Sequence, residues 1–245
     1  MKILIELAYL GSAYSGFQVQ ENAPSVQKAL QESLEMFFGM PLLITGCSRT
    51  DSGVHARQFF ATAEGNIAES FPVEKLPKAT ARVLPRDIVI LSASRVDESF
   101  HVRYDVEYKE YEYVIANTEI LDPFMKDRAY HYPHPLDEAL LNEAAGHFVG
   151  RHDFRGFMSQ GSKVVDTVRE IRYFTVHREG ATVRMRVAAD GFLYNMVRIL
   201  CGTLIAVAEG KIPLDTLDDV IASKDRTRAG ATLPPQGLYL SRVVY

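Results

Sequence analysis

The feature that most constrains the fold is an order of strand, helix, strand, strand that occurs in both halves of the chain. In the first half, Ile3, Ile5 and Leu7 alternate with other residues at a period of two, which is typical of a strand with one buried face. Ser25 is the expected N-cap of an amphipathic helix that ends at Gly39. Short strands are expected over residues 42–44, 58–63 and 88–93.

The pattern restarts after about residue 97. The expected elements are a strand over 108–117, a helix over 137–149 closed by Gly150, a hairpin of 170–176 with 182–188 around Gly180, helices over 192–209 and 214–223, and a strand over 238–244. The strands are mostly antiparallel candidates with helices on one side. The sequence therefore predicts an α+β fold, with an N-terminal half at 1–97 and a C-terminal half at 98–245.

The charge of the chain does not decide its class of partner. The net charge of −4 argues mildly against nucleic acid, which usually binds a basic face. Arginine outnumbers lysine by 18 to 9, however, and arginine is the better residue for phosphate contacts and for stacking on bases. An acidic body with an arginine-rich groove and an acidic enzyme with scattered salt bridges fit this composition equally well.

The chain has no run of eighteen apolar residues that would span a membrane, and Glu6 interrupts the region where a signal peptide is apolar. The start of the sequence therefore predicts the first strand of a cytoplasmic protein. The two cysteines, Cys47 and Cys201, have no metal-binding spacing and are expected to be reduced and structural.

Residues 46–56 stand apart from the rest of the chain. They lie between two expected strands and concentrate Arg49, Asp51 and Gly53 within five residues. Loops on a rigid scaffold often carry function, so this density indicates a site. On local chemistry alone, an Asx turn in which Asp51 caps its own backbone explains the segment equally well.

Three other motifs are weaker. Asp51-Ser52-Gly53 matches the signature of aspartic proteases, but that chemistry needs two carboxylates and the motif occurs once, so only a protease that dimerises would fit. Gly11 to Gly16 has the spacing of a phosphate-binding loop without its Lys-Ser/Thr. No carboxylate-rich pattern surrounds the candidate metal-binding histidines, so no metal site is expected at His131, His134, His147 and His152.

The segment at 46–56 resembles motif II of the pseudouridine synthases, in the form of the tRNA pseudouridine synthase A (TruA) family, which reads Gly-Arg-Thr-Asp-Ala-Gly-Val-His. Here Ser48 and Ser52 replace the first Gly and the Ala, and the other residues of the motif are intact. Further segments resemble motifs of the same family in the same order: residues 14–18, 100–104, 109–113, 192–198, 224–226 and 237–240.

The resemblance implies a reaction that breaks the N1 glycosidic bond of uridine, turns the base and rejoins it through C5. No atoms are added, so no cofactor is implied. Asp51 would be the nucleophile or the group that stabilises the cleaved sugar, because a carboxylate is a competent covalent catalyst at a sugar carbon. Arg198 would be the cation that keeps this buried carboxylate ionised.

Two further residues receive roles from the resemblance. Tyr111 would stack on the target uracil and help to remove the C5 proton, and Arg49 would fill the space left by the flipped base. Taken singly, these residues also have plain structural explanations: Arg198 could extend along an apolar helix with its charge in water, and Tyr111 could be sheet packing. His55 is interpreted as a hydrogen-bonded turn histidine.

The resemblance also implies the architecture and the partners. It implies two ferredoxin-like, RRM-like halves that form a central mixed, largely antiparallel sheet with helices on the outside, and a homodimer that contacts one tRNA. The implied substrates are the uridines at positions 38, 39 and 40 of the tRNA anticodon stem-loop. Two other classes stay open: a non-catalytic tRNA-binding relative, against which the intact Asp51, Tyr111 and Arg198 argue, and the dimeric protease, against which Arg49-Thr50 and the excess length argue.

Overall fold

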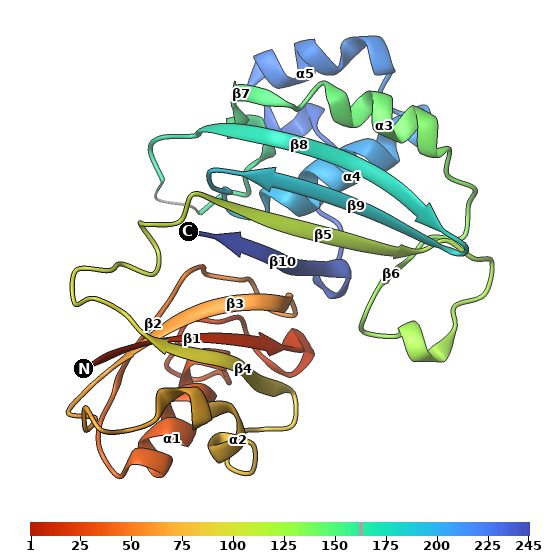
Figure 1. Cartoon of the computed structure of the whole chain (residues 1–245). Helices are drawn as coiled ribbons and strands as arrows, with labels where there is room; N and C mark the ends of the chain where they lie inside the picture. Colours follow the sequence, from red (N-terminus) through yellow and green to blue (C-terminus); the bar gives the residue numbers. More distant parts are fainter. Residues whose placement is uncertain (162–163) are drawn as a thin grey trace. The chain divides into compact units, whose positions relative to one another are not determined.

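The computed structural model describes residues 1–161 and 164–245, which form two compact units (Figure 1). Met1–Glu107 and Leu240–Tyr245 make up the first unit, and Tyr108–Tyr239 make up the second. The sequence predicts a domain boundary between residues 97 and 98, and this boundary stays a prediction. The last strand of the chain, β10 (Leu238–Val244), begins in the second unit and ends in the first.

The first unit has the order strand, helix, strand, strand, helix, strand. Its elements are β1 (Lys2–Tyr9), α1 (Val26–Phe38), β2 (Leu43–Gly46), β3 (His55–Glu64), α2 (Leu76–Thr80) and β4 (Ile88–Arg95). The strands run antiparallel in the order β4-β1-β3, and β2 pairs with β3. This order and this connectivity are those of a ferredoxin-like unit. The inward residues of β1, Ile3, Ile5 and Leu7, are fully buried, which confirms the period-two prediction.

The second unit repeats this plan with insertions. Its elements are β5 (Tyr108–Ala116), β6 (Tyr130–His131), α3 (Glu138–Gly146), β7 (Gly150–Asp153), β8 (Val168–Glu179), β9 (Thr182–Ala189), α4 (Met196–Ala208), α5 (Leu217–Ser223) and the start of β10. The strand order is β10-β5-β9-β8-β7, and β6 pairs with β5 in parallel. The predicted α+β class and the mixed, largely antiparallel pairing are confirmed.

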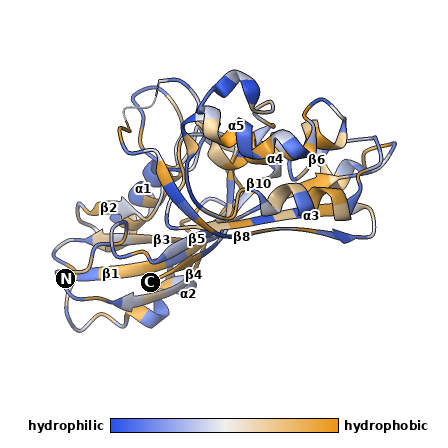
Figure 2. Cartoon of the chain, turned by 90° about the horizontal axis from the view of Figure 1, so that it is seen from above, coloured by the Kyte–Doolittle hydropathy of each residue, from blue (hydrophilic) through white to orange (hydrophobic). Residues whose placement is uncertain are grey.

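Helices cover one face of the strands in each unit. α2 packs on β4, α3 packs on β8, and α4 packs on β5. Figure 2 shows hydrophobic and hydrophilic residues interleaved along the strands and helices, as expected for elements with one buried face. Because the helices bury one apolar face of the strands, the opposite face of the strands in each unit is left for other contacts.

Most of the predicted element boundaries agree with the structure, two of the predicted helices differ for local reasons, and α2, β6 and β7 were not predicted. Ser25 caps α1 by accepting a hydrogen bond from the Lys28 amide, and Gly39 ends it at a φ of 69°. The helix expected over 137–149 ends at Gly146, and Gly150 opens β7 at a φ of 104°. The helix expected over 192–209 begins only at Met196, because Asn195 takes a left-handed φ of 60°.

α4 approaches the segment 229–233 at main-chain distance. A Cβ atom at Gly202 would lie 1.8 Å from the Ala231 carbonyl oxygen, and one at Gly230 would lie 2.4 Å from the Gly202 carbonyl oxygen. The Gly230 amide donates to Thr203 Oγ1 at 2.9 Å. Glycine is therefore required on both sides of this contact, which holds residues 229–233 against α4.

This contact predicts that Gly202→Ala destabilises the chain by about 1–3 kcal/mol or more, because the added methyl group has no room without main-chain movement. Gly146→Ala is the control, since no described atom apart from its chain neighbours and the backbone of its own helix lies within 4 Å of a Cβ built there. That change should stabilise α3 by roughly 0.5–1 kcal/mol. Urea unfolding measures both, and equal free energies of unfolding for the two variants would contradict the packing account.

Candidate active site

The loop between β2 and β3 carries Arg49, Thr50 and Asp51 in three different environments. The Arg49 side chain is exposed, Thr50 is buried and Asp51 is half-buried. The Asp51 main-chain carbonyl accepts a hydrogen bond from the Val54 amide at 3.1 Å, and Gly53 supplies a φ of 78° within this turn. A positive φ at the third turn position favours glycine. A main-chain turn therefore follows Asp51, and Gly53 makes it possible.

A second loop, residues 11–17, packs against this turn. The Phe17 amide donates to the Thr50 carbonyl at 3.1 Å, and the Gly53 amide donates to the Tyr14 carbonyl at 3.2 Å. A Cβ at Gly16 would lie 2.6 Å from the Thr50 carbonyl oxygen, and one at Gly11 would lie 2.0 Å from the Val54 carbonyl oxygen. The glycines that give this loop the spacing of a phosphate-binding motif thus permit close packing against the Asp51 loop.

Buried polar side chains fix the same loop from inside the unit. Thr50 Oγ1 and the Tyr9 hydroxyl are 2.7 Å apart, and His55 Nδ1 accepts from the Gly11 amide at 2.9 Å. His55 is fully buried at the start of β3. The interpretation of His55 as a hydrogen-bonded structural histidine agrees with this contact, although the residue opens a strand.

Aromatic packing completes the support of the loop. The rings of Phe17 and Phe59 stack with centroids 4.2 Å apart, and a Cβ at Gly46 would lie 2.3 Å from the Phe17 ring. The Tyr14 hydroxyl donates to Asp87 at 2.7 Å, and burial together with Asp87 raises the pKa of that tyrosine. Tyr14 therefore stays neutral and serves as a fixed donor.

In the second unit, Tyr111 lies near the start of β5. Its side chain is 7% exposed, and its ring meets Phe192 edge to face with centroids 5.1 Å apart. Tyr113, two residues later, donates its hydroxyl to the Pro234 carbonyl at 2.7 Å. Burial raises the pKa of Tyr113. The two tyrosines thus lie two residues apart on one strand.

Arg198 lies in the first turn of α4, where two groups of its own unit hold the guanidinium. Nε donates to the Leu233 carbonyl at 2.6 Å, and Nη1 donates to Asn195 Oδ1 at 2.6 Å. The Leu233 amide donates back to the Arg198 carbonyl at 3.3 Å. The side chain is half-buried, so these bonds fix the direction of a cation that is partly removed from water.

The segment 224–226 holds the loop that supports Arg198. Arg226 donates to the Gly230 carbonyl at 2.9 Å and to Thr232 Oγ1 at 3.1 Å. Lys224 forms an ion pair of 2.8 Å with Asp153. Burial raises the pKa of Asp153, but hydrogen bonds from Lys224, Thr167 and the Arg155 amide outweigh burial and lower this pKa to about 2. These charged side chains therefore have structural partners.

Within the described residues, no group of three or more histidine, cysteine or carboxylate side chains could hold a metal ion. Three of the four histidines considered from the sequence have hydrogen-bond partners: His131 with the Thr118 carbonyl, His147 with Asp218, and His152 with the Val149 carbonyl. No helix among the described residues is long and apolar enough to cross a membrane.

Comparison with known proteins decides the family. A family model described as tRNA pseudouridine synthase matches residues 7–105 and 144–245. The chain belongs to the tRNA pseudouridine synthase family. A protein of Thermoanaerobacter sp. (strain X514) named tRNA pseudouridine synthase A is 42% identical over 243 residues, which is 99% of each chain. Relatives of the same name from Ruminiclostridium cellulolyticum and Bacillus pumilus are 42% and 39% identical, each over 100% of this chain and 99% of the relative.

Membership makes this tRNA pseudouridine synthase an isomerase and confirms the resemblance found in the sequence. The structure places Arg49 and Asp51 together on one loop of the first unit, and it places Tyr111 and Arg198 in the second unit. Sequence reasoning missed the groups that hold them: Tyr9, Gly11, Asn195 and the Leu233 main chain. Asn195 and Gly11 left signals, since asparagine is enriched at left-handed positions and Gly11 belongs to the glycine spacing noted in the sequence.

If Arg198 takes part in the reaction, as the resemblance implies, its hydrogen bond to Asn195 predicts that Asn195→Gly slows the synthase while the fold is kept. Glycine accepts the φ of 60° but lacks the amide oxygen, and a hydrogen bond to a charged group is worth about 1.5–3 kcal/mol. The rate under single-turnover conditions should therefore fall by roughly tenfold or more. Ser159→Ala removes only the other side-chain hydrogen bond of Asn195, from its Nδ2 to Ser159 Oγ, and is the control. A loss of rate as large as that of glycine would argue against this role for the amide oxygen.

Proposed function

We propose that this synthase converts uridine to pseudouridine at positions 38, 39 and 40 of the tRNA anticodon stem-loop, with Asp51 as nucleophile and without a cofactor. The observation that carries this proposal is the construction of the Asp51 loop. In a member of the synthase family, a half-buried carboxylate follows a buried threonine and precedes a glycine turn, and a second loop holds the turn by main-chain bonds.

The proposed reaction needs only groups of the chain. The Asp51 carboxylate attacks the sugar carbon while the bond to uracil N1 breaks and its electrons leave with the base. The base turns within the site, C5 forms the new bond to the same carbon, and the carboxylate is released. C5 then loses its proton and N1 gains one. Reactant and product have the same atoms, so the step requires no oxidant, reductant or group donor.

Arg198 and Tyr111 have proposed roles in these steps. A carboxylate that is removed from water ionises more readily beside a cation, so Arg198 is proposed to keep Asp51 charged. Its two hydrogen bonds within the second unit support this role, because they hold the guanidinium in one direction. Tyr111 is proposed to stack on the target uracil and to help remove the C5 proton. Its edge-to-face contact with Phe192 supports a fixed ring.

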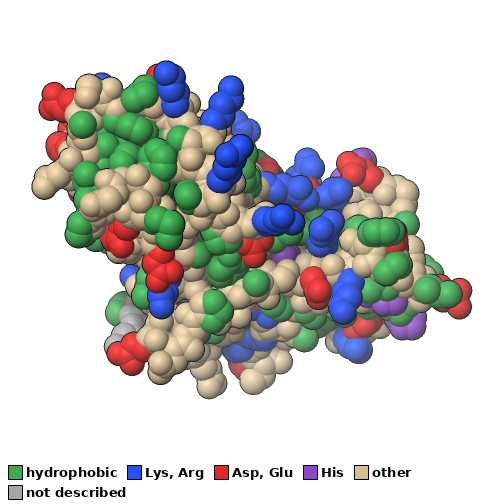
Figure 3. Space-filling view, turned by 90° about the horizontal axis from the view of Figure 1, so that it is seen from below, with side chains coloured by type: hydrophobic (Ala, Val, Ile, Leu, Met, Phe, Trp, Pro, Cys, Tyr) green, Lys and Arg blue, Asp and Glu red, His purple; other side chains and the backbone are tan. Residues whose placement is uncertain are grey.

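The proposed partner is tRNA, bound by a homodimer in the cytoplasm. Figure 3 shows Lys and Arg side chains gathered in groups on one surface of the molecule, although the net charge is −4. Local groups of this kind neutralise phosphates whatever the sum over the chain. A target base within a stem has to leave the helix to reach any protein group, so base flipping is part of the proposal.

Two other functions are weighed against this one. A dimeric aspartic protease would use Asp51-Ser52-Gly53, and a non-catalytic relative would bind tRNA without turnover. Release of tritium from tRNA labelled at uridine C5 separates the three, because only the synthase breaks that C–H bond. Tritium release by the wild-type chain supports the proposal, and its absence with intact binding would support the non-catalytic relative.

The central prediction is that Asp51→Asn abolishes turnover and keeps tRNA binding. Asparagine preserves the shape of the side chain and removes its nucleophilicity, while phosphate contacts elsewhere supply most of the affinity. The rate of tritium release should fall by more than roughly a thousandfold, as is typical when a catalytic group is removed. Ser52→Ala, which restores the residue of the family motif, is the control and should stay active. Residual turnover within tenfold of wild type would remove Asp51 from this role.

A second prediction concerns Arg49, whose exposed side chain lies two residues before Asp51. If Arg49 holds the helix open after the base leaves, Arg49→Ala should reduce modification at positions 39 and 40, within the stem, more than at position 38 at the loop edge. Flipping costs a few kcal/mol from a paired stem and less from an unpaired site. Mapping of pseudouridine on one tRNA with uridine at all three positions measures this. Equal loss at the three positions would reduce Arg49 to a phosphate contact.

A further inference from the structure

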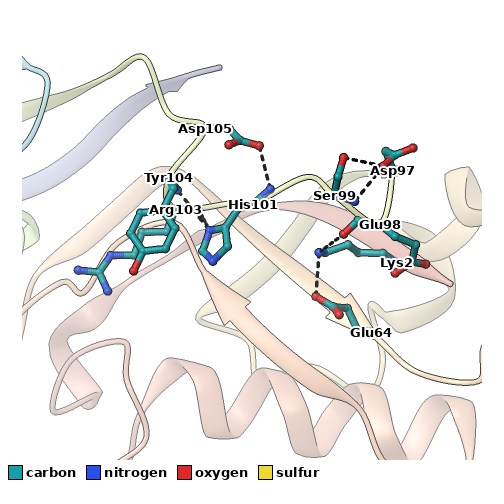
Figure 4. A network of polar contacts seen from close by, with 9 residues as sticks. All are labelled: Lys2, Glu64, Asp97, Glu98, Ser99, His101, Arg103, Tyr104 and Asp105. Atoms are coloured by element: carbon teal, nitrogen blue, oxygen red, sulfur yellow. Dashed lines mark hydrogen bonds and ion pairs between the residues drawn. The ribbon is translucent and has the colours of Figure 1, made fainter.

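Residues 96–107 follow β4 and are tied to the first unit at several points. The Val96 amide donates to the Lys2 carbonyl at 3.3 Å. The Lys2 ammonium donates to the Glu98 carbonyl at 3.1 Å and lies 3.2 Å from the Glu64 carboxylate (Figure 4). The Glu107 amide donates to the Val244 carbonyl at 2.8 Å. The segment is therefore an anchored part of the first unit.

Inward side chains fix the middle of this segment. Val102 is 1% exposed, and its carbonyl accepts from the Tyr245 hydroxyl at 2.7 Å. The Phe100 ring lies 5.2 Å from the Tyr245 ring. Burial raises the pKa of Tyr245, so its hydroxyl stays a donor at neutral pH. Val102, Phe100 and the partly exposed Tyr245 thus hold one side of the segment against the unit.

The exposed side chains of the segment include the acidic Asp97, Glu98, Asp105 and Glu107 and a group of three, His101, Arg103 and Tyr104. All three are exposed, and Tyr104 is 73% exposed. The His101 and Tyr104 rings lie with centroids 4.2 Å apart, and the Arg103 guanidinium lies 5.8 Å from the Tyr104 centroid. The three side chains form a layered group, drawn in Figure 4.

The main chain fixes this group in place. His101 Nδ1 accepts from the amides of Arg103 and Tyr104 at 3.2 and 3.3 Å, and the Tyr104 amide also lies 3.1 Å from the His101 carbonyl. Asp105 accepts from the His101 amide at 2.8 Å, and Figure 4 shows its carboxylate turned away from the Arg103 and Tyr104 side chains. The acidic group therefore does not cover the exposed rings.

We propose that His101, Arg103 and Tyr104 form a contact site for the substrate RNA outside the catalytic groups. An unpaired base stacks on the exposed Tyr104 ring, and Arg103 binds a phosphate beside it. Exposed aromatic rings with a neighbouring cation are the combination that binds single-stranded nucleic acid, because every base offers a face for stacking. The site rests on the proposed function, since it supplies affinity for the same tRNA, and it is not a site of chemistry.

The test measures tRNA affinity and the single-turnover rate at saturating enzyme, with an unmodified tRNA transcript, for the full-length chain. Tyr104→Ala should weaken binding by roughly 5- to 150-fold, the value of one stacked base, and leave the saturated rate unchanged. Tyr104→Phe keeps the ring and should bind within about twofold of wild type. Arg103→Ala should weaken binding and lower the slope of log affinity against log salt by about 1.

Met36→Ala is the matched control, because Met36 is 74% exposed on α1 and has no role in the proposed site. Thermal unfolding of each variant checks that the fold is kept. Unchanged affinity in Tyr104→Ala, or an equal loss in Met36→Ala, would overturn the proposal. Failure of the proposed function is a different result, since the wild-type chain would then release no tritium from tRNA whatever Tyr104 does.

Discussion

The packing of two loops at main-chain distance is the constraint on which the Asp51 site depends. Gly11 and Gly16 bring their loop so close that a Cβ at either would lie 2.6 Å or less from a carbonyl oxygen of the Asp51 loop. Hydrogen bonds between the loops then run from main chain to main chain, as from Phe17 to Thr50. Main-chain bonds of this kind fix the position of the loop that carries the Asp51 carboxylate.

Much of the fold could be predicted, because the strands have one buried face and α1 and α3 have side-chain N-caps. The alternation of Ile3, Ile5 and Leu7 and the cap at Ser25 are local signals, and local signals survive in the structure. The misplaced start of α4 has a different cause. Its apolar run continues upstream to Phe192, and periodicity cannot show that Asn195 leaves the helical region at a φ of 60°.

For the proposed site too, some residues could be predicted from the sequence and others only from the fold. Arg49, Asp51, Tyr111 and Arg198 could be proposed as site residues from motifs, because chemistry restricts which side chains can serve in such a site. Several of their supports could not be named, because they are main-chain groups, such as the Leu233 carbonyl that accepts from Arg198. Any residue offers a carbonyl, so no sequence pattern marks that position. The need for glycine at 202 and 230 could not be predicted from the sequence either, because only the fold shows that their hydrogens face a neighbouring backbone.

The number of arginines in the sequence is a poor guide to RNA affinity, because several arginine side chains bind other groups of the protein. Arg184 and Arg186 both bind the buried carboxylate of Glu112, at 3.0 and 2.9 Å. The hydrogen bond between Arg186 and Glu112 raises the pKa of Arg186. Arg178 donates to the Leu136 carbonyl at 2.8 Å, and Arg226 is likewise bonded within its own unit. Arginines with such internal partners contribute less to a phosphate contact than an exposed side chain such as Arg103 does. Affinity for RNA therefore depends on where the free guanidinium groups lie, and neither the net charge of −4 nor the arginine count measures that.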